Sequence, residues 1–491
     1  MSIFREYDIR GIFQQDLTQD VVCKIGYLLG KIIKQYDNKV AIGYDARTHS
    51  PILFDWLASG FTSADITVYN LGMIPTPVAY FCTFTTDITS SIMITGSHNP
   101  PEYNGFKITI NQAPFYGKDI QHIARVLTST TFAIKPTQSI ERFSLLQDYI
   151  KFISNEFAFL KGWKEKIVFD CGNGVASLAL QKILQNLQLN SINLYFEPDG
   201  NFPNHHPDPS EEKNLIALKQ ALQQHNLHIG IAYDGDADRV GLISQKHNFK
   251  GDELAILFAK DIATTTPNPI VIGEVKCSQI MYDYINTIGK AVMYKTGHSN
   301  LKVKLKELNA ALACEMSGHI FFNDRYFGYD DAIYASFRIL ELIYKATQHT
   351  TYQYAMLPLE EMISSLPQSY STAEEKIAAT EENKFQIIAN LQQTLIKLQE
   401  QTRVDSNDKE SSAPFIKEII TIDGVRVIFA HGWGLIRASN TSPVLVTRFE
   451  AHSEEYVTYY RNFLIGLLQK EQAQFKCMES ENIQKTRNQH L

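Results

Sequence analysis

The sequence predicts an α/β protein built from three similar mixed α/β units and a distinct C-terminal α+β domain. Short β-branched runs alternate with segments of helical apolar spacing, a pattern typical of mixed or parallel sheets covered by helices. The pattern restarts near residues 147, 250 and 365. At roughly 150 residues per domain, 491 residues allow about two to four domains, so a single small core is excluded.

The predicted strands of the first three units are rich in Val, Ile and aromatic residues. They cover 39–45, 66–72, 90–96, 166–174, 228–236 and 269–275. Helical spacing is clear at 178–188 and 214–225, which lie between predicted strands. This alternation justifies the mixed α/β sandwich assignment of these units.

The last part of the chain has a different order of elements. A long Glu- and Gln-rich stretch around 374–400 predicts a helix, and strands follow at 416–430. The polar, Ser-rich segment 403–414 between them predicts a loop insertion. We therefore divide the chain into four domains with the limits 1–146, 147–248, 249–364 and 365–491.

The composition is that of a folded globular protein, with 44% hydrophobic and 20% charged residues. A formal net charge of -7 supplies no basic field for phosphate backbones, so we expect no nucleic-acid partner. The cysteines lie far apart without a C-x-x-C pair, which favours neither a zinc ribbon nor a disulfide scaffold. Charges interrupt the N-terminal segment and no apolar run approaches ~18 residues, which predicts a cytoplasmic protein without membrane contact.

Three aspartates, Asp234, Asp236 and Asp238, follow a predicted strand at alternating positions with only Gly and Ala between them. Small spacers let a tight turn direct the three carboxylates to one point, where they would repel each other without a cation. A Mg2+ site is one interpretation and a solvated acidic turn is the other. Arg239 favours an anionic ligand beside the metal, because a guanidinium can bind two phosphate oxygens at once.

The segment 92–108 is predicted as a strand that runs into a loop rich in Gly, Asn and Pro. This loop carries Ser97, His98 and Lys107. A serine there can be a nucleophile or a phosphate carrier when a neighbouring group exchanges a proton and a metal neutralises the phosphate. The alternative is a turn in which Ser and Asn cap backbone groups.

Two further loops gather groups that suit a sugar phosphate. Glu315, Ser317 and His319 alternate, so a short loop can direct three polar groups to one side, as binding of neighbouring sugar hydroxyls requires. The other loop combines a fixed cation with neutral hydrogen-bonding groups, as a phosphate dianion requires. It consists of Arg437, Ser439, Asn440 and Thr441. Taken alone, either segment is more often an ordinary surface loop.

Together, in this order, these segments resemble the α-D-phosphohexomutase superfamily, specifically its bacterial phosphomannomutase/phosphoglucomutase branch. The resemblance covers nearly the whole chain. It extends to FREYDIRG (4–11), GYDARTHSP (43–51), PDGNFPNHHPDPS (198–210), VKCS (275–278) and GHSN (297–300). TGSHNP combined with EMSGH is similar to the mannose/glucose branch. Departures are small: Ala237 and Cys314 stand where relatives often have Gly.

The resemblance implies a mutase that moves a phosphate between O1 and O6 of mannose, glucose or both. Ser97 would be a phosphoserine and would complete a Mg2+ site with the three aspartates. A hexose 1,6-bisphosphate is the implied intermediate and activator. It must turn end over end in one central cleft to which all four domains contribute. Hexose phosphates are the implied partners, and we expect a monomer.

The resemblance also implies substrate contacts. The phosphate that does not react would be bound by Arg437, Ser439, Asn440 and Thr441, with Tyr7, Lys276 and His298 nearby. Glu315 and Ser317 would bind sugar hydroxyls, with His319 in the same loop. The transferring phosphoryl group would be bordered by Arg10, Lys107 and Arg239. Lys107 or His98 would exchange a proton with the sugar hydroxyl.

Two other interpretations stay open. The sequence DADRV at 236–240 fits the pattern of haloacid dehalogenase-type phosphatases and mutases, in which Asp236 would carry the phosphate instead of Ser97. The second is a non-catalytic, sugar-phosphate-binding paralogue. It predicts losses at the catalytic positions, and the sequence has none.

Overall fold

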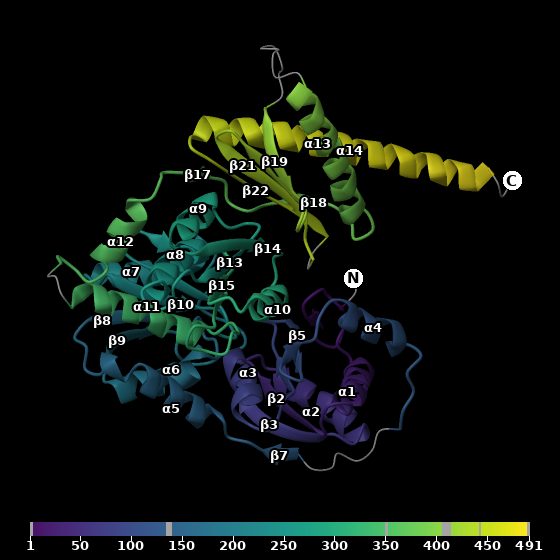
Figure 1. The fold of residues 1–491 in the computed structure, drawn as a ribbon. Helices are drawn as coiled ribbons and strands as arrows, with labels where there is room; N and C mark the ends of the chain where they lie inside the picture. The colour runs from purple at the N-terminus through teal and green to yellow at the C-terminus, as the bar shows by residue number, and fades with distance from the viewer. Residues whose placement is uncertain (1–2, 134–139, 349–351, 405–413, 441–442, 489–491) are drawn as a thin grey trace. The chain divides into compact units, whose positions relative to one another are not determined.

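The computed structural model describes residues 3–133, 140–348, 352–404, 414–440 and 443–488, with backbone alone at 402–404 and 474–488. The chain divides into two compact units. The larger comprises residues 1–293 and 297–365, and the smaller comprises 294–296 and 366–491. Among the described residues, three sheets build the larger unit and one builds the smaller (Figure 1). Most of the predicted insertion at 403–414 lies outside the described residues.

The first sheet of the larger unit is mixed, with the strand order β1-β5-β4-β2-β3-β7 and β6 beside β5. Strands β2, β3, β4 and β7 run parallel, whereas β1 and β5 pair antiparallel. The strands are β1 (Ile9–Ile12), β2 (Lys39–Tyr44), β3 (Thr67–Met73), β4 (Ser91–Ile94), β5 (Tyr103–Ile110), β6 (Ala113–Pro114) and β7 (Ile140–Arg142). The helices are α1 (Gln19–Ile33), α2 (Ser50–Ser63), α3 (Thr76–Thr85) and α4 (Lys118–Leu127). Gly26 and Gly60 bring α1 and α2 into backbone contact, since a Cβ on Gly26 would lie 2.3 Å from the carbonyl oxygen of Leu57.

The second sheet has the order β12-β11-β10-β8-β9. Its strands β8, β9 and β10 are parallel, and β11 and β12 add to them antiparallel. The strands are β8 (Lys166–Asp170), β9 (Asn190–Leu194), β10 (Ile229–Tyr233), β11 (Val240–Ile243) and β12 (Asn248–Phe249). The helices are α5 (Leu146–Glu156), α6 (Ala176–Leu187) and α7 (Ile216–Gln224), with 3-10 turns at Ala158–Leu160 and Glu212–Leu215.

The third sheet has the order β14-β13-β15-β16, with β13 and β15 parallel and β16 antiparallel. The strands are β13 (Ile270–Glu274), β14 (Lys290–Tyr294), β15 (Leu312–Cys314) and β16 (Ile320–Phe322). The helices are α8 (Gly251–Ile262), α9 (Gln279–Ile288), α10 (His298–Leu308), α11 (Ala332–Thr347) and α12 (Leu357–Ser364). Each of the three sheets of the larger unit is thus mixed and accompanied by helices, which confirms the predicted repetition of α/β units.

The smaller unit is organised differently. Its sheet is antiparallel, in the order β17-β22-β21-β20-β19 with β18 beside β22. The strands are β17 (Tyr370–Ser371), β18 (Glu375–Ala378), β19 (Ile416–Ile420), β20 (Val425–Phe429), β21 (Gly432–Ala438) and β22 (Val444–Ala451). The helices α13 (Lys384–Val404) and α14 (Glu454–Asn488) share one apolar core with the sheet. This arrangement confirms the distinct C-terminal α+β domain.

One predicted element of this unit is wrong in its extent. The stretch around 374–400 was expected to be helical throughout, but β18 occupies Glu375–Ala378 and α13 begins only at Lys384. The residues before Lys384 are good helix formers, yet they pair with β22, where Lys376 lies opposite Val446. Tertiary pairing therefore outweighs local helix propensity here.

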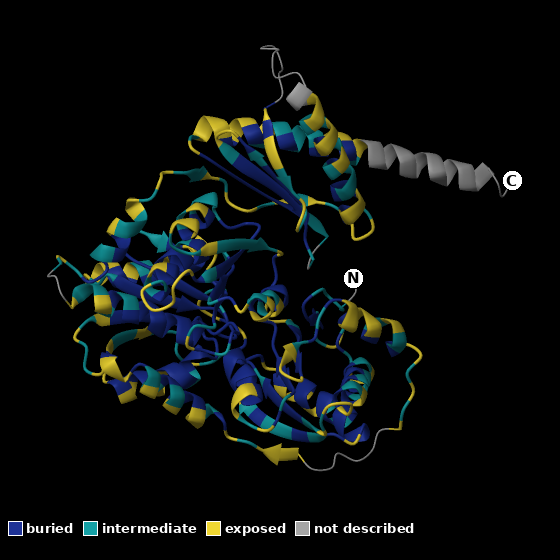
Figure 2. Cartoon of the chain, in the orientation of Figure 1, coloured by how far each residue is buried: buried dark blue, intermediate teal, exposed yellow. Residues whose placement is uncertain are grey.

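Figure 2 shows buried residues concentrated in the sheets and on the inner helix faces. In the first sheet, Ile42, Ile92 and Phe106 from neighbouring strands are fully buried in one cluster. The cysteines whose side chains are described are buried and form no disulfide with one another. No helix in the described part of the chain is long and apolar enough to cross a membrane.

The fold brings several predicted loops to equivalent ends of strands. Ser97 follows β4, Asp234 follows β10, Lys276 follows β13 and Glu315 follows β15. Each of these strands has a parallel neighbour in its sheet. Ligands of α/β proteins generally bind beyond the carboxyl ends of such strands. The larger unit therefore presents these four loops where a binding site is expected.

Candidate active site

Ser97 lies in a buried turn directly after β4. Its φ of +49° is in the left-handed region, and its backbone N–H donates to Thr95 Oγ1 at 2.8 Å. The hydroxyl donates to Asp234 Oδ2 at 3.0 Å and lies 3.1 Å from His98 Nδ1. The only serine in the TGSHNP segment thus touches the acidic cluster and a ring nitrogen at the same time.

The three predicted aspartates come together in the turn between β10 and β11. All of them are completely buried. Asp234 Oδ1 accepts hydrogen bonds from the backbone N–H groups of Asp238 and Arg239, at 3.0 and 3.1 Å, which closes the turn. Asp236 Oδ2 accepts from Thr76 Oγ1 at 2.5 Å. Burial, followed by the charges of Asp238 and Asp236, raises the pKa of Asp234 well above its usual value.

The geometry of these carboxylates fits a divalent cation. One oxygen from each aspartate lies within 4.8 Å of the others. Asp236 Oδ1 and Asp238 Oδ1 are buried and accept no hydrogen bond from any described residue. Buried oxygens without donors are costly unless an ion or a water binds them. Oxygen ligands from carboxylates are those that Mg2+ prefers.

Lys107 does not lie in the loop in which the sequence placed it. It lies on β5, opposite Met93 of β4, because residues 103–110 form the second strand of a β-hairpin. Its Nζ donates to Asp236 Oδ2 at 2.6 Å and also to Asp238. Burial opposes the charge of Lys107, but the carboxylates Asp236 and Asp238 outweigh it and raise the lysine pKa well above its usual range.

Two arginines lie close to the turn that carries Ser97 and His98. Arg10, on β1, donates to the Gly96 carbonyl oxygen at 3.0 Å and pairs with Asp8, while its buried Nε has no hydrogen-bond partner among the described residues. Arg239 follows the acidic turn, and its Nε donates to His319 Nε2 at 2.9 Å. Desolvation and then the cations Arg239 and Arg10 lower the pKa of His98 well below its usual value. His98 is therefore a neutral neighbour of the serine.

The predicted sugar loop connects β15 and β16. Glu315 is buried, and its Oε1 accepts a hydrogen bond from the Gly297 N–H at 2.8 Å. Ser317 Oγ donates to Glu315 Oε2 at 3.3 Å. These two side chains thus form one polar pair, as their alternation in the sequence predicts. His319 is turned elsewhere, toward the acidic cluster.

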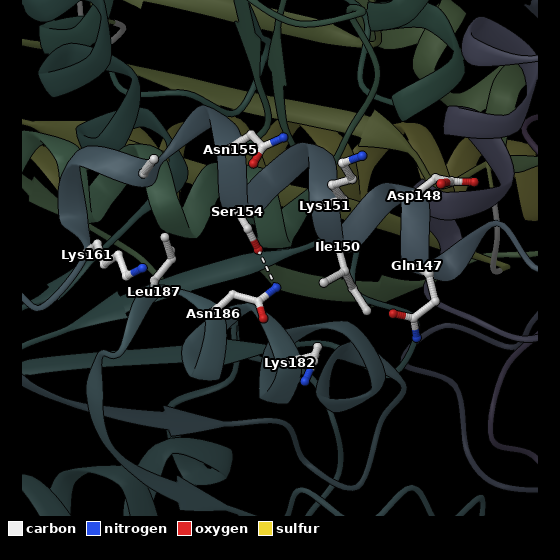
Figure 3. Close-up of a pocket in the computed structure, with 11 residues that line it drawn as sticks. Gln147, Asp148, Ile150, Lys151, Ser154, Asn155, Lys161, Lys182, Asn186 and Leu187 are labelled. Carbon is white, nitrogen blue, oxygen red and sulfur yellow. Dashed lines mark hydrogen bonds between the residues drawn. The ribbon is translucent and has the colours of Figure 1, made fainter.

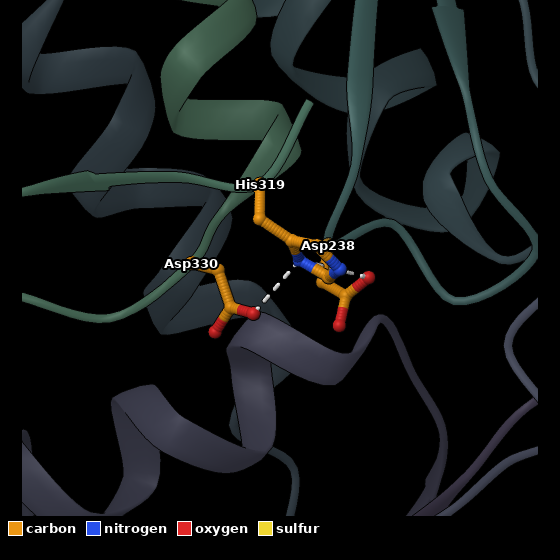
Figure 4. Close-up of side chains that lie close together, drawn as sticks. All are labelled: Asp238, His319 and Asp330. Carbon is orange, nitrogen blue, oxygen red and sulfur yellow. Dashed lines mark ion pairs between the residues drawn. The ribbon is translucent and has the colours of Figure 1, made fainter. Parts of the chain in front are cut away.

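Figure 4 shows His319 between two buried aspartates. Its Nδ1 lies 3.0 Å from Asp330 Oδ2 and 3.6 Å from Asp238 Oδ1. Lys302 Nζ lies 2.7 Å from the other Asp330 oxygen. The sequence analysis missed Asp330 and Lys302. The Asp-Asp pair lies directly before α11, where Asp331 caps the helix, but nothing in the sequence connected Asp330 to His319.

Of the remaining predicted residues of the larger unit, Tyr7 and His298 lie together at the start of α10, and Lys276 follows β13. His298 is the first residue of this helix, and its ring centre lies 6.1 Å from that of Tyr7. Burial and then Lys302 lower the pKa of His298 well below its usual value. Lys276 Nζ lies 3.8 Å from Glu274 Oε1, just beyond β13. Tyr7, His298 and Lys276 are all largely buried polar residues.

The predicted phosphate loop lies in the smaller unit, at the end of β21. Arg437 is buried, and its Nε donates to Asp423 Oδ2 at 3.0 Å. The same oxygen accepts a hydrogen bond from the Thr296 N–H at 3.1 Å. Ser439 begins the turn, where its N–H donates to the Val444 carbonyl oxygen, and Asn440 follows. Thr441 lies outside the described residues, and Asp423 was missed by the sequence analysis.

A surface groove of about 600 Å³ lies apart from these residues, between α5 and α6 (Figure 3). Its lining includes Lys151, Ser154, Lys182 and Asn186, and Asn186 donates to Ser154 Oγ at 3.1 Å. None of the predicted site residues lines it. The groove is open to solvent and contributes nothing to the cluster around Ser97.

Models of known protein families match each of the four successive parts of the chain. Models of phosphoglucomutase/phosphomannomutase α/β/α domains I, II and III match residues 1–133, 147–248 and 250–367. The model of the C-terminal domain of the same family matches residues 377–466. These matches follow one another in the order of the four sheets.

Similar proteins extend over nearly the full chain. A phosphomannomutase/phosphoglucomutase from Pseudomonas aeruginosa is 40% identical over 470 residues, which cover 94% of this chain and 95% of that protein. A phosphoglucomutase from Neisseria meningitidis is 38% identical over 468 residues, with the same coverage of both chains. The crystal structure of a phosphoglucomutase/phosphomannomutase family protein from Burkholderia thailandensis has a TM-score of 0.83 and 34% identity, covering 96% of this chain and 97% of its own. The chain therefore belongs to the phosphoglucomutase/phosphomannomutase family.

Proposed function

We propose that this protein interconverts hexose 1-phosphates and hexose 6-phosphates of mannose and glucose through a phosphoserine at Ser97. The observation that carries the proposal is the buried Ser97 hydroxyl, hydrogen-bonded to Asp234 and adjacent to His98. Family membership and the activities named for the similar proteins from Pseudomonas and Neisseria support it. A serine held against an acidic metal site is suited to carry a phosphate.

The reaction consists of two phosphoryl transfers. In the first, the free hydroxyl of a hexose monophosphate attacks the phosphorus of phosphorylated Ser97. The bond from phosphorus to Ser97 Oγ breaks, a bond to the sugar oxygen forms, and the sugar hydroxyl proton leaves while the serine oxygen regains one. The product is a hexose 1,6-bisphosphate. After it turns over, Ser97 Oγ attacks the other phosphate, which restores the phosphoserine and releases the isomeric monophosphate.

We propose that Asp234, Asp236, Asp238 and the Ser97 phosphate together hold one Mg2+. The donor-free oxygens Asp236 Oδ1 and Asp238 Oδ1 support this assignment. When bound, the ion supplies positive charge that stabilises the phosphoryl oxygens during transfer. The chain's own contribution is to bury three carboxylates at one point and to fix Asp234 with two backbone N–H donors.

Cations of the chain would surround the transferring group. Arg10, whose buried Nε–H has no acceptor among the described residues, and Arg239 would bind phosphoryl oxygens. Lys107 would contribute a permanent positive charge, because its raised pKa opposes a role as a base. His98 is the better of the two predicted proton carriers, since its lowered pKa keeps it neutral and its Nδ1 lies 3.1 Å from Ser97 Oγ.

Substrate binding would use polar residues outside the serine loop. We propose that Glu315 and Ser317 bind sugar hydroxyls, with His319 beside them, and that the phosphate not being transferred is bound by a set of cationic and neutral hydrogen-bonding residues. This set comprises Arg437, Ser439, Asn440 and Thr441, with Tyr7, Lys276 and His298. Mannose and glucose differ at C2, and no described contact selects one of them, so we propose activity on both. The cytoplasmic location and the monomeric state stay predictions.

The test compares Ser97→Ala with Ser129→Ala, which alters an exposed serine after α4. We expect Ser97→Ala to lose nearly all conversion of glucose 1-phosphate and mannose 1-phosphate, whereas Ser129→Ala keeps the rate of the unaltered enzyme. Full activity of Ser97→Ala would contradict the proposal. Peptide mapping after incubation with glucose 1,6-bisphosphate separates it from the haloacid dehalogenase alternative, which requires phosphate on Asp236 and none on Ser97.

A further inference from the structure

Arg47, in the GYDARTHSP segment, has a completely buried side chain and follows β2 directly. Its guanidinium lies against the loop that carries Ser97, although the two are 50 positions apart in the sequence. The proposed reaction leaves Arg47 without a role. A buried arginine needs partners for its charge and its donors, so the contacts it makes are informative.

Every N–H group of this guanidinium is used. Arg47 Nε donates to Asp45 Oδ2 at 3.1 Å. The other donors all bind backbone carbonyl oxygens of one loop: Pro100 at 2.5 Å, Tyr103 at 2.9 Å, Ser97 at 2.9 Å and Asn99 at 2.6 Å. An arginine has five N–H donors in a fixed plane, and here each one has its own acceptor. The side chain therefore forms the inner support of the loop from 97 to 103.

Asp45 holds the start of the same loop. Its Oδ2 accepts hydrogen bonds from Thr95 Oγ1 at 2.8 Å and from the Gly96 N–H at 3.2 Å. Its Oδ1 accepts from Ser50 Oγ at 2.8 Å. Asp45 and Arg47 are thus an ion pair that contacts the chain on both sides of Ser97.

Close packing prevents the guanidinium from moving. On one side lies Gly96, where a Cβ would come within 2.4 Å of Arg47 Cζ. The centre of the Phe202 ring lies 5.2 Å from the guanidinium carbon, a cation–π contact. Gly200 also approaches closely, since a Cβ there would lie 2.4 Å from Arg47 Cα. The PDGNFP segment therefore covers the arginine that supports the serine loop.

The backbone of Ser97 needs such support. Its φ of +49° is unfavourable for a residue with a side chain, and the next carbonyl groups must point inward, away from water. Arg47 allows the carbonyl groups to point inward, because its Nη2 donates hydrogen bonds to the carbonyl oxygens of both Ser97 and Asn99. Without it, these carbonyls would have to turn to find other donors.

We propose that Arg47 is a positioning residue that fixes the backbone of the Ser97 loop so that Ser97 Oγ faces Asp234 in the geometry phosphoryl transfer requires. The role in transfer rests on the proposed function. The proposal predicts that lysine cannot replace Arg47. A lysine has three donors on one nitrogen and no planar fork, so at least two of the five acceptors, including at least one carbonyl oxygen of the loop, lose their partner.

The experiment compares Arg47→Lys with Arg338→Lys. Arg338 is an equally buried arginine of the larger unit whose Nη atoms donate to Asp324 at 2.9 Å, away from the serine loop. Hydrogen exchange measured by mass spectrometry should show faster exchange of the peptide covering 96–103 in Arg47→Lys and unchanged exchange there in Arg338→Lys. Because a misplaced reacting group costs about 100-fold in rate, we expect kcat of Arg47→Lys to fall by about that factor with KM changed less than about threefold.

Unchanged exchange of the 96–103 peptide in folded Arg47→Lys would overturn the proposal, and so would an unchanged kcat. If Arg47→Lys does not fold, Phe202→Leu decides instead, because it removes only the ring that covers the guanidinium. It should raise exchange of the same peptide and lower kcat a few-fold, and no change in either would equally overturn the proposal. An absence of mutase activity in the unaltered protein would refute the proposed function, whereas the exchange data would still decide the support of the loop by Arg47.

Discussion

At the scale of single residues, Arg437 combines two properties that suit a phosphate ligand. It is buried at the end of β21, and its Nε is fixed by Asp423, which leaves the direction of the guanidinium defined. A fixed guanidinium binds a phosphate dianion through charge-assisted hydrogen bonds, each of which contributes about 1.5–3 kcal/mol. Asp423 also accepts a hydrogen bond from the Thr296 N–H, so the carboxylate that holds the arginine is itself fixed in place.

Arg437→Ala is therefore expected to weaken substrate binding more than turnover. A loss of about 2–3 kcal/mol corresponds to a rise in KM of roughly 30-fold to 150-fold for glucose 1-phosphate, with a smaller change in kcat. Steady-state kinetics measure this directly. The matched control is Lys417→Ala, which removes an exposed cation from β19 of the same sheet and should leave KM as it is. Unchanged KM and kcat in Arg437→Ala would exclude it from phosphate binding.

Sequence reasoning could identify residues that act together within one short segment. The aspartates 234, 236 and 238 and the serine at 97 were recognisable because their spacing or their loop composition carried the chemistry. Asp330 and Asp423 were not, because each acts on a partner outside its own short segment, His319 and Arg437 respectively. The position of Lys107 was misjudged for a related reason, since β-hairpin pairing decides it.

At the scale of elements, the strands of the larger unit were predictable because buried strands are continuous β-branched runs. All six predicted runs contain a strand of the structure, from β2 to β13. Turns were harder to judge. Ala237 has a φ of +65°, in the left-handed region that favours glycine, and nothing in the sequence indicated this for an alanine. The helix start near 374 was predicted wrongly for a similar reason. The segment of β18 becomes a strand only because it pairs with β22.

The start of helix α11 carries a buried carboxyl group, Asp331, that makes stability depend on pH. Asp331 caps the helix by accepting from the Tyr334 N–H at 2.8 Å, and it also accepts from the hydroxyls of Tyr149 at 2.9 Å and Tyr326 at 2.7 Å. Tyr149 belongs to α5, so the carboxyl group links two helices. Burial raises the pKa of Asp331 from 3.8 to about 6, against the hydrogen bonds that favour its charged form.

This raised pKa defines how stability depends on pH. The folded state holds the proton of Asp331 more tightly than the unfolded state does, so the stabilisation is complete below about pH 4 and is lost as pH rises through about 6. At 1.36 kcal/mol per pKa unit the loss is about 3 kcal/mol. Asp331→Asn removes this titration. The melting temperature of Asp331→Asn minus that of the unaltered protein should therefore increase from pH 4 to pH 7.

Thermal unfolding followed at several pH values checks this expectation. Asp148→Asn is the control, because it removes an exposed acidic group from α5 without altering the capping network. A melting-temperature difference for Asp331→Asn that stays constant from pH 4 to pH 7 would contradict the assignment. The same result would mean that Asp331 is charged in the folded state throughout this range.

At the scale of the whole molecule, the net charge of -7 argues against a nucleic-acid surface but not against an anionic substrate. Arg10, Arg239 and Lys107 gather around the serine loop within the larger unit, each close to an acidic or a serine-loop group. The negative net charge of the chain therefore does not prevent a local cluster of cations around the serine loop. The domain limits after residues 146, 248 and 364 stay predictions, supported by the assignment of β7 to the first sheet and of α5 to the region that follows.

The two compact units have separate cores, and this predicts two unfolding transitions. Leu391 of α13 is fully buried in the core of the smaller unit, whereas Leu57 of α2 is fully buried in the larger. Each leucine-to-alanine change leaves a cavity and costs about 2–5 kcal/mol. By calorimetry, Leu391→Ala should lower one transition and Leu57→Ala the other.

Magnesium provides an independent marker for the larger unit. The proposed ligands Asp234, Asp236 and Asp238 all belong to it, and a ligand raises only the transition of the unit that binds it. Addition of Mg2+ should therefore raise the transition that Leu57→Ala lowers and leave unchanged the one that Leu391→Ala lowers. Asp236→Asn, which keeps the size of the side chain, should abolish the shift. A single transition that moves with both leucine variants and with Mg2+ would show instead that the units unfold as one cooperative body.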